Sequence, residues 1–76
     1  MEIKVLGTGC PKCKKLEQLV KEAVTELGII AEVEKVTDIN EIVNYGVMLT
    51  PALVIDGKVI FAGRLPNKEE IKKILK

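Results

Sequence analysis

The pair Asp56-Gly57 lies between two apolar, β-branched segments and constrains the fold more than any other feature of the sequence. The segments are residues 52–55 before the pair and residues 58–61 after it. Two such segments joined by Asp-Gly are typical of a β-hairpin with a type I′ turn, because both central residues of that turn need positive φ angles. The second half of the chain is therefore expected to contain two antiparallel strands joined by a two-residue loop.

The first 28 residues change from a strand pattern to a helix pattern. A strand is expected over residues 1–6, ending at Gly7-Thr8-Gly9. Downstream, apolar residues recur at spacings of three and four, as they do on one face of an amphipathic helix. Pro11 suits the first helical position, and Gly28 suits the position just after the last turn. The expected apolar face consists of Leu16, Leu19, Val20, Ala23, Val24 and Leu27.

A second strand and a short helix are expected next. Residues 29–36 are rich in β-branched side chains, and alternating glutamates indicate one wetter face, as in an edge strand. Asp38 and Glu41 have the spacing of a capping box, which predicts the start of a helix that ends near Tyr45-Gly46. The buried face of this helix is expected to consist of Ile39, Ile42 and Val43.

The sequence closes with the pattern of a third helix. Asn67 is expected to cap it, with Glu70 three residues later, and its apolar face is expected to contain Ile71, Ile74 and Leu75. The order of elements is then β-α-β-α-β-β-α. We expect an α/β fold in which the first two strands are parallel, the hairpin is antiparallel, and helices cover both faces of a four-stranded mixed sheet. Residues 1–76 are expected to form one domain.

Composition limits the possible classes of function. Twelve basic and eleven acidic residues give a formal net charge of +1, without the basic surplus of nucleic-acid binders. One Phe, one Tyr and no Trp leave little to stack on bases. No apolar segment approaches the roughly 20 residues that span a bilayer, and residues 1–4 lack the features of a signal peptide. We therefore expect a cytoplasmic monomer that binds neither nucleic acid nor membranes.

The motif Cys10-Pro11-Lys12-Cys13 falls at the turn from the first strand into the first helix. A helix N-terminus stabilises anions, so a cysteine at the N-cap, where Cys10 is expected, is favoured as the thiolate that attacks disulfides. Cys13 follows three residues later on the same helical face, a spacing compatible with a disulfide. We interpret Cys10 as the nucleophile that attacks a target disulfide and Cys13 as the residue that resolves the mixed disulfide.

Two other interpretations of the cysteine pair stay open. Cysteine is often buried as a small hydrophobic residue, without chemistry. Two thiolates also suit Cu(I), and ferredoxin-like metal carriers have a C-x-x-C at their first β–α turn. Those carriers run β-α-β-β-α-β and usually have Met two positions before the first cysteine, where this chain has Thr8. Two Cys and no His provide only half of the ligands of a structural zinc site.

The combined features resemble the thioredoxin/glutaredoxin superfamily, in particular its small, glutaredoxin-sized redox-active disulfide proteins. They are the C-x-x-C after the first strand, Thr50-Pro51 before the penultimate strand, the hairpin, and the final helix. The resemblance implies a thiol–disulfide oxidoreductase that acts on protein disulfides and is recharged by an upstream reductase or thiol donor. It implies no bound cofactor or metal, only a redox-active Cys10–Cys13 disulfide.

The family's functional residues map onto this sequence position by position. Cys10 matches the nucleophilic cysteine, Cys13 the resolving cysteine, and Gly63 the glycine near the end of the last strand. Pro51 matches the cis-proline that packs against the disulfide, so a cis Thr50–Pro51 bond is implied. Thr50 is then implied to offer backbone groups to an extended substrate peptide. Substrate contacts are expected at Thr50, Pro51, Pro11 and Lys12.

Some positions depart from the family pattern. Lys4 falls near the place of the buried carboxylate of thioredoxins, and Lys12 replaces the Tyr of the glutaredoxin C-P-Y-C. Ala62-Gly63-Arg64 replaces the glycine-glycine-aspartate turn that helps glutaredoxins hold glutathione, so the electron donor stays open. Met48 and Leu49 either line an apolar groove beside the disulfide or fill the core. A module that kept the fold and lost turnover is a third alternative.

Overall fold

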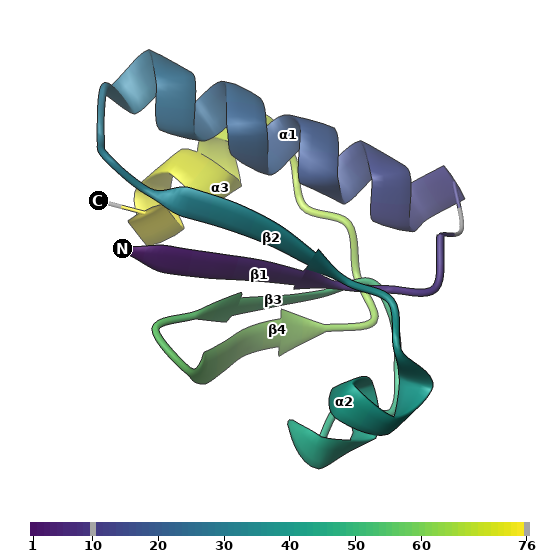
Figure 1. Ribbon diagram of the computed structural model, residues 1–76. Helices are drawn as coiled ribbons and strands as arrows, with labels where there is room; N and C mark the ends of the chain where they lie inside the picture. The colour runs from purple at the N-terminus through teal and green to yellow at the C-terminus, as the bar shows by residue number, and fades with distance from the viewer. Residues whose placement is uncertain (10, 76) are drawn as a thin grey trace.

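The computed structural model, which describes residues 1–9 and 11–75, has the expected order of elements, β-α-β-α-β-β-α (Figure 1). Within that part of the chain, no helix is both long and apolar enough to cross a bilayer. The elements are β1 (Glu2–Leu6), α1 (Pro11–Leu27), β2 (Glu32–Val36), α2 (Ile39–Asn44), β3 (Ala52–Ile55), β4 (Lys58–Ala62) and α3 (Lys68–Leu75).

The four strands form one mixed sheet in the order β2-β1-β3-β4. Strand β1 pairs parallel with β2 and antiparallel with β3, and β3 pairs antiparallel with β4. The register of the last pair shifts between Leu53 and Val54, so that Leu53 faces Phe61 while Val54 faces Val59. The predicted mixed sheet and the edge position of the second strand are therefore confirmed.

Local signals placed the turns and helix ends correctly. Asp56 and Gly57 have φ angles of 49° and 84°, as both central residues of a type I′ turn require. The Asn67 side-chain oxygen accepts a hydrogen bond of 2.9 Å from the Glu70 backbone N–H, which confirms Asn67 as the N-cap of α3. Gly28, with a φ of 66°, ends α1 in the left-handed conformation that favours glycine.

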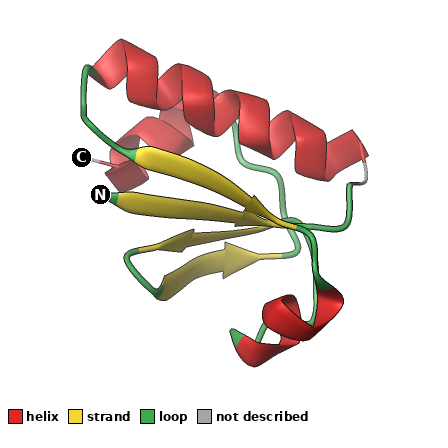
Figure 2. Ribbon diagram, in the orientation of Figure 1, coloured by secondary structure: helices red, strands yellow, loops and turns green. Residues whose placement is uncertain are grey.

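Helices cover both faces of the sheet (Figure 2). Alternation along β1 sends Ile3 and Val5 to the face covered by α1 and α3, and Leu6 to the face covered by α2. The larger core cluster contains Ile3, Val5, Leu16, Val20, Ala23, Leu53, Ile71 and Leu75. The smaller cluster contains Leu6, Val36, Ile42, Val47, Ala52 and Val54.

Two expectations about the middle of the chain were wrong. The second strand begins at Glu32 rather than at residue 29, because Glu32 donates to the carbonyl of Met1 and no strand residue precedes Glu2 to extend the pairing. In α2 only Ile42 is buried, whereas Ile39 and Val43 are exposed. A six-residue helix presents about one side chain per turn to the sheet, so the other apolar residues face outward.

An ion-pair network joins α1 to α3. The Glu26 carboxylate receives the Lys68 ammonium at 2.5 Å and the Lys72 ammonium at 2.6 Å, and Lys68 also lies 4.0 Å from Glu22. The hydrogen bonds from Lys68 and Lys72 lower the pKa of Glu26 from its usual 4.5 to about 2. The charged form of Glu26 is therefore favoured in the folded chain.

We predict that the ion pairs of Glu26 make the stability of the chain depend on pH in the acid range. Because folding lowers the pKa of Glu26, its stabilising contribution is complete above pH 4.5 and is lost as the pH falls towards about 2. The free energy of unfolding of Glu26→Gln should therefore depend less on pH than that of the wild type over this range. Urea titrations at several pH values measure this, with Glu34→Gln on the β2 edge as the control. Parallel pH profiles for the wild type and Glu26→Gln would contradict the prediction.

Candidate active site

The N-terminal end of α1 presents a positive surface. Pro11 and Lys12 occupy its first two positions and are exposed, and its first turn contains no acidic side chain. In a helix of 17 residues the free backbone N–H groups of the first turn favour a negative charge beside them. Cys10, the predicted nucleophile, lies outside the described residues.

Cys13 lies inside the first turn of α1 and is buried, with 2% of its surface exposed. It is not a free thiol in this structure. The end of β1 packs tightly against it, because a Cβ added at Gly7 would lie 2.3 Å from the Cys13 Sγ. The sequence analysis identified Gly7 only as the end of a strand and missed this contact. The signal that could have indicated it is a glycine three residues before a C-x-x-C motif.

The loop before β3 contains the expected cis-proline. The Thr50–Pro51 peptide bond is cis, as the family resemblance implied, and Pro51 is buried. The backbone N–H of Gly63, which directly follows β4, donates a hydrogen bond of 2.9 Å to the Pro51 carbonyl. The end of the last strand and the proline loop are therefore held together.

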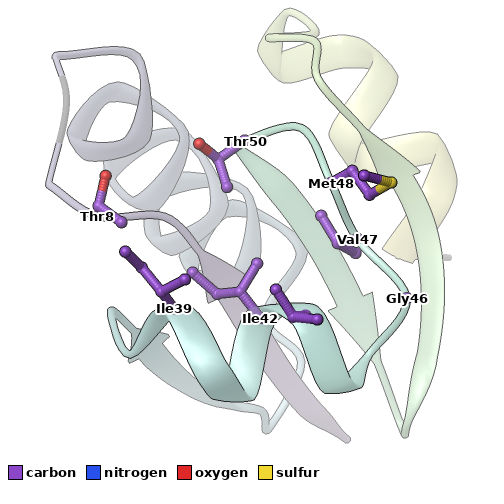
Figure 3. A pocket seen from close by; sticks show the side chains of 8 residues that line it. Thr8, Ile39, Ile42, Gly46, Val47, Met48 and Thr50 are labelled. Atoms are coloured by element: carbon purple, nitrogen blue, oxygen red, sulfur yellow. The ribbon is translucent and has the colours of Figure 1, made fainter.

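A groove joins the turn after β1 to this loop. Its volume is about 480 Å³, and Figure 3 shows Ile39 and Ile42 of α2 along one side, with Thr8 and Thr50 towards α1. The groove brings Thr8, two residues before Cys10, to the same cavity as Thr50, next to Pro51. Pro11 and Lys12 do not line it. The lining residues are Thr8, Ile39, Ile42, Val43, Gly46, Val47, Met48 and Thr50.

Large apolar side chains are exposed around this groove. Met48 is 93% exposed and Ile39 64%, and Val43 and Leu49 are also exposed. Of the two interpretations of Met48 and Leu49, core filling is therefore wrong for both, and Met48 lines the groove. Ile39 and Val43 were expected in the core, so their place in the groove was missed. The sequence could not show which apolar residues of a short helix face away from the sheet.

Comparison with known proteins identifies the family. A sequence model described as Thioredoxin domain matches residues 1–76. A thioredoxin of Methanocaldococcus jannaschii is 51% identical over 97% of this chain and 85% of its own length. A thioredoxin of Methanothermobacter thermautotrophicus is 48% identical over 99% of this chain and 97% of its own length. The chain belongs to the thioredoxin family.

In this thioredoxin-family chain, Lys4 lies in β1, near the position where the family resemblance implied a carboxylate. The Lys4 ammonium donates a hydrogen bond of 3.0 Å to the Tyr45 hydroxyl and lies 3.4 Å from a Glu2 carboxylate oxygen. It also lies 5.7 Å from the centre of the Tyr45 ring. The bond to Tyr45 and the interaction with Glu2 raise the pKa of Lys4. Lys4 is therefore held between Tyr45, the C-cap residue of α2, and Glu2 of β1.

We predict that Gly63→Ala destabilises the chain more than Gly57→Ala does. Both glycines have positive φ angles, 74° and 84°, so each substitution strains the backbone by about 1–2 kcal/mol. Only at Gly63 would the new Cβ also meet a neighbour, the Leu49 Cβ at 2.8 Å; at Gly57 nothing lies within 4 Å. Urea unfolding under reducing conditions measures both losses. Equal losses of stability in the two variants would contradict the prediction, because they would show that the Leu49 side chain moves aside without a measurable loss of stability.

Proposed function

We propose that the chain is a thiol–disulfide oxidoreductase that exchanges electrons with protein disulfides through Cys10-Pro11-Lys12-Cys13. The observation that carries the proposal is the burial of Cys13 in the first turn of α1, directly behind the exposed Pro11 and Lys12. A resolving thiol that is shielded from solvent suits the second step of disulfide exchange, in which it attacks the neighbouring mixed disulfide. Membership of the thioredoxin family supports the same chemistry.

The proposed reaction reduces one disulfide for each Cys10–Cys13 pair. The Cys10 thiolate attacks one sulfur of the target disulfide, and the second target sulfur leaves as a thiolate that takes up a proton. The Cys13 thiolate then attacks the Cys10 sulfur, forms the Cys10–Cys13 bond and releases the first target sulfur as a thiolate. The target gains two electrons and the chain loses two. An upstream reductase or thiol donor returns them.

The proposed substrate site extends from this motif into the groove. An extended segment of the target would lie along the Thr50 backbone, as the family resemblance implies, and an apolar side chain near its cysteine would fill the groove. Burial of one such side chain contributes about 1.5–3 kcal/mol, enough to favour apolar neighbours of the target disulfide. A monomeric, cytoplasmic protein is part of this proposal.

A soft-metal carrier is the alternative use of the same cysteine pair. The order of elements disfavours it, because α2 separates β2 from the hairpin and α3 follows β4. The ferredoxin-like order β-α-β-β-α-β has neither feature. Among the described residues, no group of three His, Cys, Asp or Glu side chains is placed to hold a metal ion. The two thiols themselves still permit Cu(I), so the first experiment includes this outcome.

The first experiment equilibrates the protein across thiol/disulfide ratios, traps free thiols with an alkylating mass tag, and counts the tags by mass spectrometry. We expect two tags to be lost together at one midpoint, with the monomer mass unchanged. Related couples span roughly −270 to −120 mV, and the midpoint would show whether the chain reduces or oxidises its targets. Failure to form an intramolecular disulfide, with both thiols protected by stoichiometric Cu(I), would replace this proposal with the metal carrier.

The groove predicts a substrate effect that can be measured separately from the redox step. Ile39→Asp places a charge in the groove and should raise the KM for insulin, a protein disulfide substrate, by roughly tenfold. Its KM for the small, polar 2-hydroxyethyl disulfide should not change. Ile30→Asp is the matched control, because Ile30 is 95% exposed beside Met1 and does not line the groove. Equal effects of the two substitutions on insulin reduction would rule out the groove as the substrate site.

A further inference from the structure

The side chain of Cys13 occupies the position where a side chain at Gly7 would lie. A Cβ at Gly7 would lie 2.3 Å from the Cys13 Sγ and 2.7 Å from the Cys13 Cβ. Real Cβ atoms do not approach other atoms so closely, so any larger residue at this position forces something to move. Cys13 is almost fully buried, and the contact is therefore part of the packed interior.

Hydrogen bonds and strand pairing hold the backbone at Gly7 in place. The Gly7 N–H donates a hydrogen bond of 2.9 Å to the Val36 carbonyl of β2. The preceding residue, Leu6, is fully buried and is paired with Val36 on one side and Ala52 on the other. A methyl group at Gly7 therefore cannot be accommodated by moving the end of β1 without breaking the pairing of the central strand.

The backbone of Gly7 does not itself require glycine. The glycines with positive φ angles are Gly9, Gly28, Gly46, Gly57 and Gly63, and Gly7 is not among them. Alanine at this position is consequently free of the backbone strain that it would meet at the other five. The requirement for glycine comes from the space that Cys13 occupies.

We propose that Gly7 is a positioning residue for Cys13: its missing side chain seats the Cys13 sulfur against the end of β1. The inference rests on the proposed function, in which Cys13 resolves the mixed disulfide at Cys10. Displacement of the sulfur by Gly7→Ala changes how easily Cys13 is reached and how readily it closes the disulfide. A glycine outside the C-x-x-C motif thus sets the behaviour of its second cysteine.

A double-mutant cycle tests the contact without relying on redox activity. Gly7→Ala, Cys13→Ala and the double variant are unfolded in urea under reducing conditions, with Gly57→Ala as a control for general loss of stability. We expect Gly7→Ala to lower the urea midpoint, and Cys13→Ala to remove much of that loss because it deletes the sulfur. Additive effects would overturn the proposal. If Gly7→Ala does not fold, recovery of folding in the double variant supports the contact, and its failure overturns it.

A second measurement tests positioning rather than stability. In the Cys10→Ser background, Gly7→Ala should raise the rate of Cys13 alkylation by roughly tenfold, because overpacking displaces the buried sulfur. With both cysteines present, Gly7→Ala should shift the redox midpoint, whereas Gly57→Ala should not. Unchanged alkylation and an unchanged midpoint in a folded Gly7→Ala protein would overturn the inference and leave the proposed function intact. A wild type that forms no disulfide would instead overturn both.

Discussion

The pairing of β1 on both of its sides is the constraint on which the described structure depends. Its residues pair with β2 in parallel and with β3 antiparallel, and β4 joins the sheet through β3. The alternation of its side chains divides the interior into two clusters, one beneath α1 and α3 and one beneath α2. Leu6 pairs with both β2 and β3, so the point at which the chain leaves the sheet is fixed. Gly7 and Thr8 follow from that point towards the start of α1.

Much of this arrangement could be predicted from local signals. The Asp56-Gly57 turn, the Asn67 cap and the glycine after α1 each depend on a few adjacent residues, and their chemistry is the same in any fold. The apolar stripe of α1 could also be predicted, because a helix of 17 residues repeats the period often enough to make it distinct. Recognition of the thioredoxin family added what the residues alone did not, namely the cis peptide bond at Thr50–Pro51.

The errors arose where tertiary structure decides. A short helix has too few turns for a periodic pattern to show which side is buried. Ile39 and Val43 were therefore assigned to the core, although Ile42 is the one buried residue of α2. The start of β2 depended on where its partner β1 begins, which the β-branched residues 29–31 could not indicate. The Gly7 contact joins two segments that meet only after α1 has packed on the sheet. Two of these places, the outer face of α2 and the Gly7 contact, belong to the candidate site.

Part of the groove is lined by apolar side chains that do not take part in core packing. Ile39, Val43 and Met48 are exposed and belong to neither core cluster, while α2 is anchored through Ile42. Of the residues that line the groove, Ile42 and Val47 belong to the smaller core cluster, whereas substitutions at the three exposed positions leave the packed interior untouched. If the groove binds targets as proposed, duplicated copies of such a chain could differ in their targets through changes at these exposed positions, without compensating mutations in the core.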